Sequence, residues 1–274
     1  MCGIVGKISL DQKVINSEIV EKMMLQMKHR GPNDNGTFIK DNIGFGFVRL
    51  SIIDLSPDGH QPFVSEDGNF TMIFNGEIFN YIELREELIA LGYKFRTKTD
   101  TEVLLNAYIA WGEEGLHKLN GMWSFAVYDQ RNNKIFICRD RYGIKPLYYY
   151  FENNNFYFAS EIPSILSVSE QLIKANEGAI FNYLIYDRID YSKETFFKDI
   201  FSLPHGHSII IDLNNTTQQI KFTKWYDLNE KVKLAIGFKD YKDFRQSFVD
   251  AVKLRMRSDV PVGVWNFLFQ RIFS

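Results

Sequence analysis

Cysteine is scarce in this sequence, and long apolar runs are missing. Cys2 and Cys138 are the two cysteines among 274 residues. Residues 1–10 lack the basic start and the extended apolar stretch of a secretory signal peptide. No apolar run approaches the length needed to cross a membrane. These absences favour a reducing, cytoplasmic location and argue against membrane attachment.

A surplus of either charge is also missing. Lysine and arginine number 32 against 34 aspartates and glutamates, for a formal net charge of −2. No long stretch carries one sign, whereas a nucleic-acid groove or a surface for anionic lipids needs concentrated positive charge. We therefore expect neither nucleic acid nor a membrane among the partners.

Apolar and aromatic residues are abundant instead. They make up 45% of the chain, with 24 phenylalanines and 14 tyrosines, which is typical of a globular protein with a large core. Polar turns at 129–133 and 152–155 would join neighbouring strands into mostly antiparallel sheet. Short β-branched and aromatic runs predict these strands at 3–10, 43–53, 70–74, 124–128, 134–138, 146–151 and 155–159.

Helices are expected between the strands, each marked by a capping residue. Ser17 can cap residues 18–28, whose isoleucine, valine and methionine side chains form one apolar face. Two further pairs resemble capping boxes: Asn80 with Glu83 before a helix over 81–91 that ends at Gly92, and Thr99 with Glu102 before a helix over 103–111.

Two sheets covered by helices make an α+β protein with the layers of an αββα sandwich. We expect this domain to cover residues 2–213. A polar turn, a linker and the last strands would fill residues 214–239. The pattern then changes, because residues 241–257 predict a helix and residues 259–264 the beginning of a strand.

Cys2 stands between the initiator methionine and Gly3. A small residue after Met1 permits its removal, which leaves a free α-amine with a reference pKa of about 7.7–8.0 beside a thiol of about 8.5. One residue then supplies a sulfur nucleophile and a base near neutral pH. The alternative is a cysteine that follows the initiator methionine by chance, and the position of Cys2 taken alone favours this alternative. Cys138 lies in an apolar run, and we expect a buried, inert thiol there.

Asn75 and Gly76 could serve acyl transfer from an amide. The asparagine amide and the glycine backbone N–H are both donors for a tetrahedral oxyanion, and glycine lets a substrate approach the backbone closely. Asn-Gly is equally the preferred two-residue hairpin turn. The local sequence leaves both interpretations open.

Arg49 and Asp100 are candidates for binding the head group of an amino acid. An arginine among apolar neighbours is costly unless it is paired. A bidentate clamp on an α-carboxylate would explain Arg49, as would an internal salt bridge, which is locally favoured. Asp100 could hold an α-ammonium group. It could also simply occupy the cap or first turn of a helix, and the local sequence taken alone favours this second interpretation.

Motifs that are weak separately occur here together and in a fixed order. They are CGIVG at 2–6, HRGP at 29–32, RLSIID at 49–54, FNGEIFN at 74–80, TDTE at 99–102, NGMWSFA at 120–126, RDRYGIKPL at 139–147 and FASEI at 158–162. On these motifs the chain resembles the glutaminase half of glutamine-hydrolysing asparagine synthetases, over nearly the whole length from Cys2 to Val264. Asn33 departs from the aspartate that usually follows HRGP in this family.

The resemblance implies the N-terminal-nucleophile αββα fold and hydrolysis of L-glutamine to glutamate and ammonia. It makes Cys2 the nucleophile and its own α-amine the general base, through a glutamyl thioester. Asn75 and Gly76 would form the oxyanion hole. The residues that it assigns to glutamine are Arg49 for the carboxylate, Glu77 and Asp100 for the ammonium group, Asn75 and Gly76 beside the amide, and Leu50, Ser51, Ile52 and Ile53 along the wall.

The resemblance ends at residues 260–264. In the family this segment leads into a glycine-rich loop that binds the pyrophosphate of ATP. Here the pattern is lost, so we expect residues 240–264 to begin an incomplete synthetase domain and residues 265–274 to be an aberrant tail of a truncated or frameshifted product. ATP and magnesium would belong to the missing domain, and the glutaminase domain needs no cofactor or metal. The uncovered apolar residues predict aggregation or partner capture.

Other functions stay open. The acceptor of the ammonia would be set by the missing half, so a polysaccharide-modifying amidotransferase fits as well as asparagine synthesis. A non-catalytic remnant or interaction module is the alternative from a different class. The partners expected with the leading interpretation are L-glutamine and either a second copy of the chain in a homodimer or a separately supplied synthetase.

Overall fold

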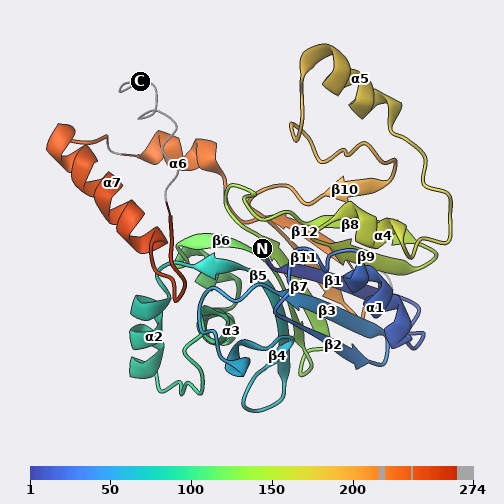
Figure 1. Cartoon of the computed structure of the whole chain (residues 1–274), viewed down its shortest axis with the longest axis horizontal. Coiled ribbons are helices and arrows are strands. Elements are labelled where there is room, and N and C mark those ends of the chain that lie inside the picture. Colours follow the sequence, from blue (N-terminus) through green and yellow to red (C-terminus); the bar gives the residue numbers. More distant parts are fainter. Residues whose placement is uncertain (216–219, 236, 264–274) are drawn as a thin grey trace.

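Two antiparallel sheets packed face to face form the centre of the protein (Figure 1). The computed structural model describes residues 1–215, 220–235 and 237–263. Within these ranges each sheet has six strands, in the order β10-β8-β9-β1-β3-β2 and β12-β11-β7-β6-β5-β4. Neighbouring strands pair antiparallel in both sheets. The predicted α+β sandwich is confirmed.

The strands agree with the short apolar runs of the sequence, and several more are present. The first sheet contains β1 (Gly3–Ser9), β2 (Asp34–Lys40), β3 (Ile43–Arg49), β8 (Tyr148–Glu152), β9 (Asn155–Ala159) and β10 (Ile200–Ser202). The second contains β4 (Phe63–Val64), β5 (Phe70–Ile78), β6 (Gly121–Asp129), β7 (Lys134–Arg139), β11 (His207–Asp212) and β12 (Ile220–Lys224). Predicted strand 43–53 ends early, at Arg49, because residues 50–56 turn into a loop.

Helices lie around the two sheets, and four of them cover the outer sheet faces. Their bounds are α1 (Ser17–Leu25), α2 (Tyr81–Ala90), α3 (Asp100–Trp111), α4 (Ile162–Leu166), α5 (Glu177–Tyr186), α6 (Leu228–Leu234) and α7 (Tyr241–Arg255), with 3₁₀ turns at Pro57–Gly59 and Gly112–His117. Buried side chains of α1 and α4 pack on the first sheet, and those of α2 and α3 pack on the second.

The core between the sheets follows from the alternation of side chains along each strand. In β1, Ile4 and Ile8 face the second sheet, whereas Val5 between them packs with the layer under α1. Phe45 and Phe158 meet edge-on in the inter-sheet layer, with ring centroids 5.9 Å apart. β1 therefore lies in the middle of the fold, and its first residues lead directly from the core to the chain start.

Two of the three capping predictions need correction. Asn16, and not Ser17, caps α1 by accepting from the backbone of Glu18. The Asn80 side chain makes no cap bond to α2, because it bonds instead to the backbone of Lys118 and Asn120 before β6. Thr99 does cap α3, accepting from Glu102 at 3.1 Å.

Two strand-related alternatives are also decided by the structure. Asn75 and Gly76 lie inside β5, opposite Ser124 and Trp123 of β6, so the hairpin-turn interpretation is wrong. The strand predicted from residue 259 is wrong for residues 259–263, which form no strand and of which Asp259 bonds to the loop after β3; Val264 lies outside the described residues.

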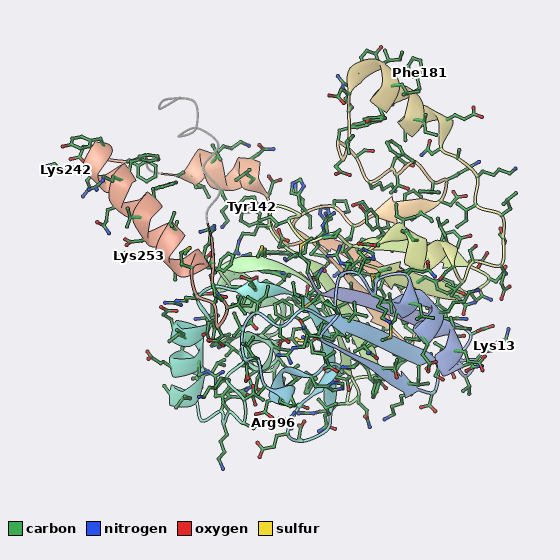
Figure 2. All side chains as sticks on the ribbon, viewed as in Figure 1. Lys13, Arg96, Tyr142, Phe181, Lys242 and Lys253 are labelled. Carbon is green, nitrogen blue, oxygen red and sulfur yellow. The ribbon has the colours of Figure 1, made fainter. Side chains whose placement is uncertain are left out.

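The predicted helix 241–257 is confirmed as α7, which ends at Arg255. Its aromatic residues are exposed as expected, including Phe244 at 53% and Phe248 at 61%; the predicted tail 265–274 lies outside the described residues. Helix α5 was not predicted, and it carries Phe181 away from the sheets (Figure 2). Among the described helices, none has the length and apolarity to span a membrane.

Replacing Phe158 with alanine tests the inter-sheet core. Phe158 is fully buried and Phe181 is 56% exposed. We expect F158A to lower the free energy of unfolding by about 3–5 kcal/mol, and F181A, the matched control, to change it by less than about 1 kcal/mol. Urea unfolding measures both. Equal losses in the two variants would contradict this packing.

Candidate active site

The pocket beside Cys2 has a volume of about 290 Å³ and is lined by both sheets and by the start of α3. Of the predicted site residues, Ser51 alone is not among those lining it. Ser51 instead faces a neighbouring hollow, where its N–H donates to Asn33 at 3.0 Å. The predicted residues that the pocket brings together are Cys2, Arg49, Leu50, Ile52, Ile53, Asn75, Gly76, Glu77 and Asp100.

Cys2 is held at the beginning of β1 by contacts to its sulfur and to its backbone. The Leu50 N–H donates to Sγ at 3.3 Å, and the Leu50 carbonyl lies 3.5 Å from the same sulfur. The buried Arg30 donates from Nε to the Cys2 carbonyl at 2.8 Å and pairs with Glu161. Burial raises the pKa of the Cys2 thiol, and the Leu50 N–H opposes this rise. The sulfur therefore needs a base to become a nucleophile.

Met1 enters the same pocket. Its amine donates to the Arg30 carbonyl at 3.1 Å, and its sulfur lies 3.7 Å from Nζ of Lys145. Burial lowers the pKa of this amine. The amine of Met1 is thus shifted toward the neutral form that accepts a proton.

Asn75 and Gly76 bring amide groups of β5 to the pocket wall. The Asn75 side chain is 1% exposed. Its Nδ2 makes one long bond, 3.5 Å to Ser160, and its Oδ1 has no protein partner. A buried amide with unused bonding capacity is costly unless a ligand completes it. A Cβ at Gly76 would lie 2.3 Å from the Met122 carbonyl, so this position requires glycine.

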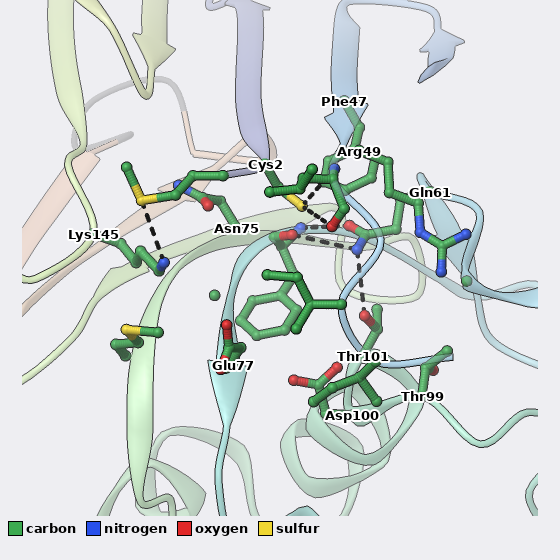
Figure 3. A pocket seen from close by; sticks show the side chains of 18 of the residues that line it. Cys2, Phe47, Arg49, Gln61, Asn75, Glu77, Thr99, Asp100, Thr101 and Lys145 are labelled. Atoms are coloured by element: carbon green, nitrogen blue, oxygen red, sulfur yellow. Dashed lines mark hydrogen bonds between the residues drawn. The ribbon is translucent and has the colours of Figure 1, made fainter. Parts of the chain in front are cut away.

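Two acidic side chains lie across the pocket from Cys2 (Figure 3). Asp100 is the first residue of α3 and accepts from the Ile78 N–H at 2.9 Å. It therefore has the first-turn position considered above and also lines the pocket. Burial raises the pKa of Asp100 to about 7, and the charge of Glu77 adds to this rise. The pKa of Glu77 is also raised by burial, against the opposing charge of Lys145.

Arg49 ends β3 and is fixed by the loop that follows. Its guanidinium donates to the Ser56 carbonyl at 2.8 Å and to the Asp54 carbonyl. These partners are backbone oxygens and not a carboxylate, so the internal salt bridge is not found among the described residues. A Cβ on Gly59 would lie 1.8 Å from Nη2, so the loop closes tightly over the arginine.

Lys145 lines the pocket without having been predicted. It is 5% exposed, and burial lowers the pKa of its amine while Glu77 opposes the change. The buried carboxylate of Asp140 orients its loop by accepting from the backbone of Tyr142, Ile144 and Lys145. Lys145 belongs to the motif at residues 139–147, and this motif is the feature of the sequence that could have identified it as a pocket residue.

Gln61 was also missed. Its Oε1 accepts a hydrogen bond from the Phe74 N–H at 2.6 Å, and its Nε2 donates to the Phe74 carbonyl at 3.3 Å. The same Nε2 lies 3.3 Å from the Thr101 hydroxyl. It thereby joins β5 to α3 beneath the pocket (Figure 3). No local pattern marks this glutamine in the sequence.

The pocket combines a thiol, unsatisfied amide groups, two carboxylates and two cationic side chains. Such a set suits a zwitterionic amino acid whose side chain reaches the sulfur. Within the described ranges, no group of three or more histidine, cysteine, aspartate or glutamate side chains is arranged to hold a metal ion.

Two antiparallel sheets between helical layers are the sandwich predicted above as the N-terminal-nucleophile hydrolase fold. Residues 1–226 match the family described as "Glutamine amidotransferase domain", and the chain belongs to that family. A solved structure of similar fold is the glutamine phosphoribosylpyrophosphate amidotransferase of B. subtilis. Its TM-score is 0.61 at 18% identity, over 82% of this chain and 49% of that one.

Curated relatives are longer than this chain. "Asparagine synthetase (glutamine-hydrolyzing) 1" of Bacillus subtilis is 40% identical over 96% of this chain and 41% of its own length. "Putative asparagine synthetase (glutamine-hydrolyzing) 2" of Methanocaldococcus jannaschii is 39% identical over 97% of this chain and 54% of its own length. The chain spans about half the length of these relatives.

Replacing Asp100 with asparagine tests the burial of this carboxyl. Its folded pKa of about 7 lies above the ordinary value of 3.8, so between these values the folded state binds more protons than the unfolded state. The free energy of unfolding of the native chain should therefore fall as pH rises through this window. D100N keeps an acceptor for Ile78 and loses the titration.

We expect D100N to be more stable than the native chain at about pH 8, and to lose this advantage at about pH 5. Thermal unfolding without glutamine measures both proteins. Parallel pH profiles would show that Asp100 has an ordinary pKa.

Proposed function

We propose that this domain hydrolyses L-glutamine to glutamate and ammonia, with Cys2 as nucleophile once Met1 has been removed. The observation that supports this most is the Cys2 sulfur in a pocket whose opposite side carries Asp100 and Glu77. Membership of the glutamine amidotransferase domain family agrees with it. Hydrolysis needs no cofactor or metal in this proposal.

The pocket residues can bind both charges of the glutamine head group. The α-ammonium group would lie against Asp100 and Glu77, and its positive charge would lower the raised pKa values of both carboxyls. Arg49 would receive the α-carboxylate through donors not used by Asp54 and Ser56. Leu50, Ile52 and Ile53 line the same side. This orientation sends the side-chain amide toward Cys2.

The chemistry follows from a thiol with a raised pKa. The free α-amine of Cys2 takes the thiol proton, and the sulfur attacks the amide carbon. The oxyanion would receive hydrogen bonds from Asn75 Nδ2 and the Gly76 N–H. The amine returns the proton to the leaving nitrogen, the C–N bond breaks and ammonia departs. Water, activated by the same amine, then cleaves the glutamyl thioester to glutamate and restores the thiol.

The names of the relatives suggest a use for the ammonia. We propose that it serves ATP-dependent synthesis of asparagine from aspartate, through a synthetase unit that is joined to this domain or supplied as a partner. A homodimer and a cytoplasmic location belong to the same proposal. The apolar aromatic residues exposed on α7, including Phe244 and Phe248, offer a surface for such a partner.

Cys2→Ala tests the nucleophile directly. We expect C2A to release glutamate from glutamine at no more than background rate, because both attack and thioester formation need the sulfur. C138A is the matched control and should keep its activity, since Cys138 is buried in β7 beside Trp123. Intact mass establishes that Met1 is absent from the protein assayed. Equal rates in C2A and the native chain would indicate a non-catalytic shell.

Asn75→Ala tests the oxyanion hole. We expect kcat to fall by about 10²–10³-fold with KM for glutamine changed by less than about threefold, because the lost donor acts in the transition state. Steady-state glutamate release measures both constants. A rise in KM at unchanged kcat would assign Asn75 to ground-state binding instead.

A further inference from the structure

The segment after α7 folds back toward the sheets (Figure 1), and Asp259 bonds there to the loop after β3. Asp259 accepts from the Asp54 N–H at 2.7 Å through its carboxylate, and its own N–H donates to the Ile52 carbonyl at 3.0 Å. These two bonds join residues more than 200 positions apart in the chain. They end on the loop that connects β3 to the 3₁₀ turn at Pro57–Gly59, and Ile52 of this loop lines the pocket.

Asp54 is the conformationally demanding residue of this loop. Its φ of 54° lies in the left-handed region, which non-glycine residues adopt only when their surroundings hold them there. Its own side chain accepts from the Ser56 N–H at 3.1 Å and from the Ser56 hydroxyl at 2.5 Å. Asp259 adds a bond to the Asp54 N–H from outside the loop. This bond thus stabilises the residue whose backbone conformation is the least favourable in the loop.

The conformation of Asp54 determines where Arg49 points. The carbonyls of Asp54 and Ser56 both accept from the Arg49 guanidinium. A change of φ at Asp54 would rotate its carbonyl and displace the guanidinium from its present place. The path from Asp259 to Arg49 therefore consists of one hydrogen bond, the backbone of Asp54 and a second hydrogen bond.

Arg257 anchors the same segment to the other side of the pocket. Its guanidinium donates to the Phe79 carbonyl at 2.7 Å and forms two bonds with Glu83 of α2, at 2.6 and 2.5 Å. Phe79 directly follows Ile78, whose N–H donates to Asp100. Residues 257–259 thus bond to two backbone segments that hold the proposed head-group contacts. One is the Asp54 loop that binds Arg49, and the other is the end of β5, whose Ile78 N–H binds Asp100.

We propose that Asp259 is a positioning residue for glutamine: it holds the Asp54 turn, and through it Arg49, in the arrangement that receives the α-carboxylate. This inference rests on the proposed function. Asp259 lies beyond residues 1–226, the part matched by the family, so affinity for glutamine depends on a segment outside the matched domain. Because coupling of binding free energies is reciprocal, glutamine in turn stabilises the docked segment 257–260.

The test compares D259A with D259N and with D250A. Asp250 is an exposed carboxylate on α7 that bonds to Gln246, far from the loop, so D250A is the matched charge control. We expect D259A to raise KM for glutamine about three- to tenfold with kcat within about twofold, because a charge-assisted bond to an exposed carboxylate is lost. D259N keeps an acceptor for Asp54 and should restore KM to within about twofold of native.

Hydrogen–deuterium exchange of residues 50–56 gives a readout that is independent of catalysis. D259A should exchange these amides faster than the native chain, while D250A and D259N should match the native rate. Unchanged KM in D259A, or unchanged exchange, would overturn the inference. An inert native chain would contradict the proposed function alone, because the exchange comparison would still decide whether Asp259 holds the loop.

Discussion

The arrangement of the pocket depends on how the start of the chain is held inside the fold. Arg30, itself buried and paired with Glu161, donates to the Cys2 carbonyl, and the Leu50 N–H meets the Cys2 sulfur. β1 continues from there between β9 and β3 in the first sheet. Cys2 carries the sulfur and, in a chain that has lost Met1, the α-amine. It therefore has a fixed position relative to the amides of β5 across the sandwich.

Burial around this point shifts the pKa of four pocket side chains toward their neutral forms. It raises the pKa of Cys2, Glu77 and Asp100 and lowers that of Lys145. A zwitterionic ligand reverses part of this, because its ammonium group favours the ionised carboxylates. In the proposed function, the ammonium group and the carboxylate of the amino acid would supply charges that complement the ionised pocket side chains. This is a physical reason for selecting a substrate with both an ammonium group and a carboxylate.

The sequence predicted the sandwich and most of the pocket, because alternation along strands is local and the motifs occur in order. It failed where tertiary contacts outweigh local preference. The local sequence leaves a turn at Asn75-Gly76 open, and only the pairing with β6 decides that it is extended. Asn80 resembles a cap, yet Lys118 and Asn120 take its side chain. The position of Lys145 depends on the Asp140 carboxylate, which accepts hydrogen bonds from several backbone N–H groups of the same loop. The contact of Asp259 with the loop after β3 joins parts of the chain that are distant in sequence.

The central claim is that glutamine is cleaved through a thioester on Cys2 in a chain that has lost Met1. Mass spectrometry of protein quenched with acid during turnover tests it most directly. We expect a glutamyl adduct on the peptide that begins with Cys2 and none on the peptide containing Cys138. Turnover by chains that still carry Met1, or turnover with no adduct on Cys2 under conditions that trap thioesters, would contradict it.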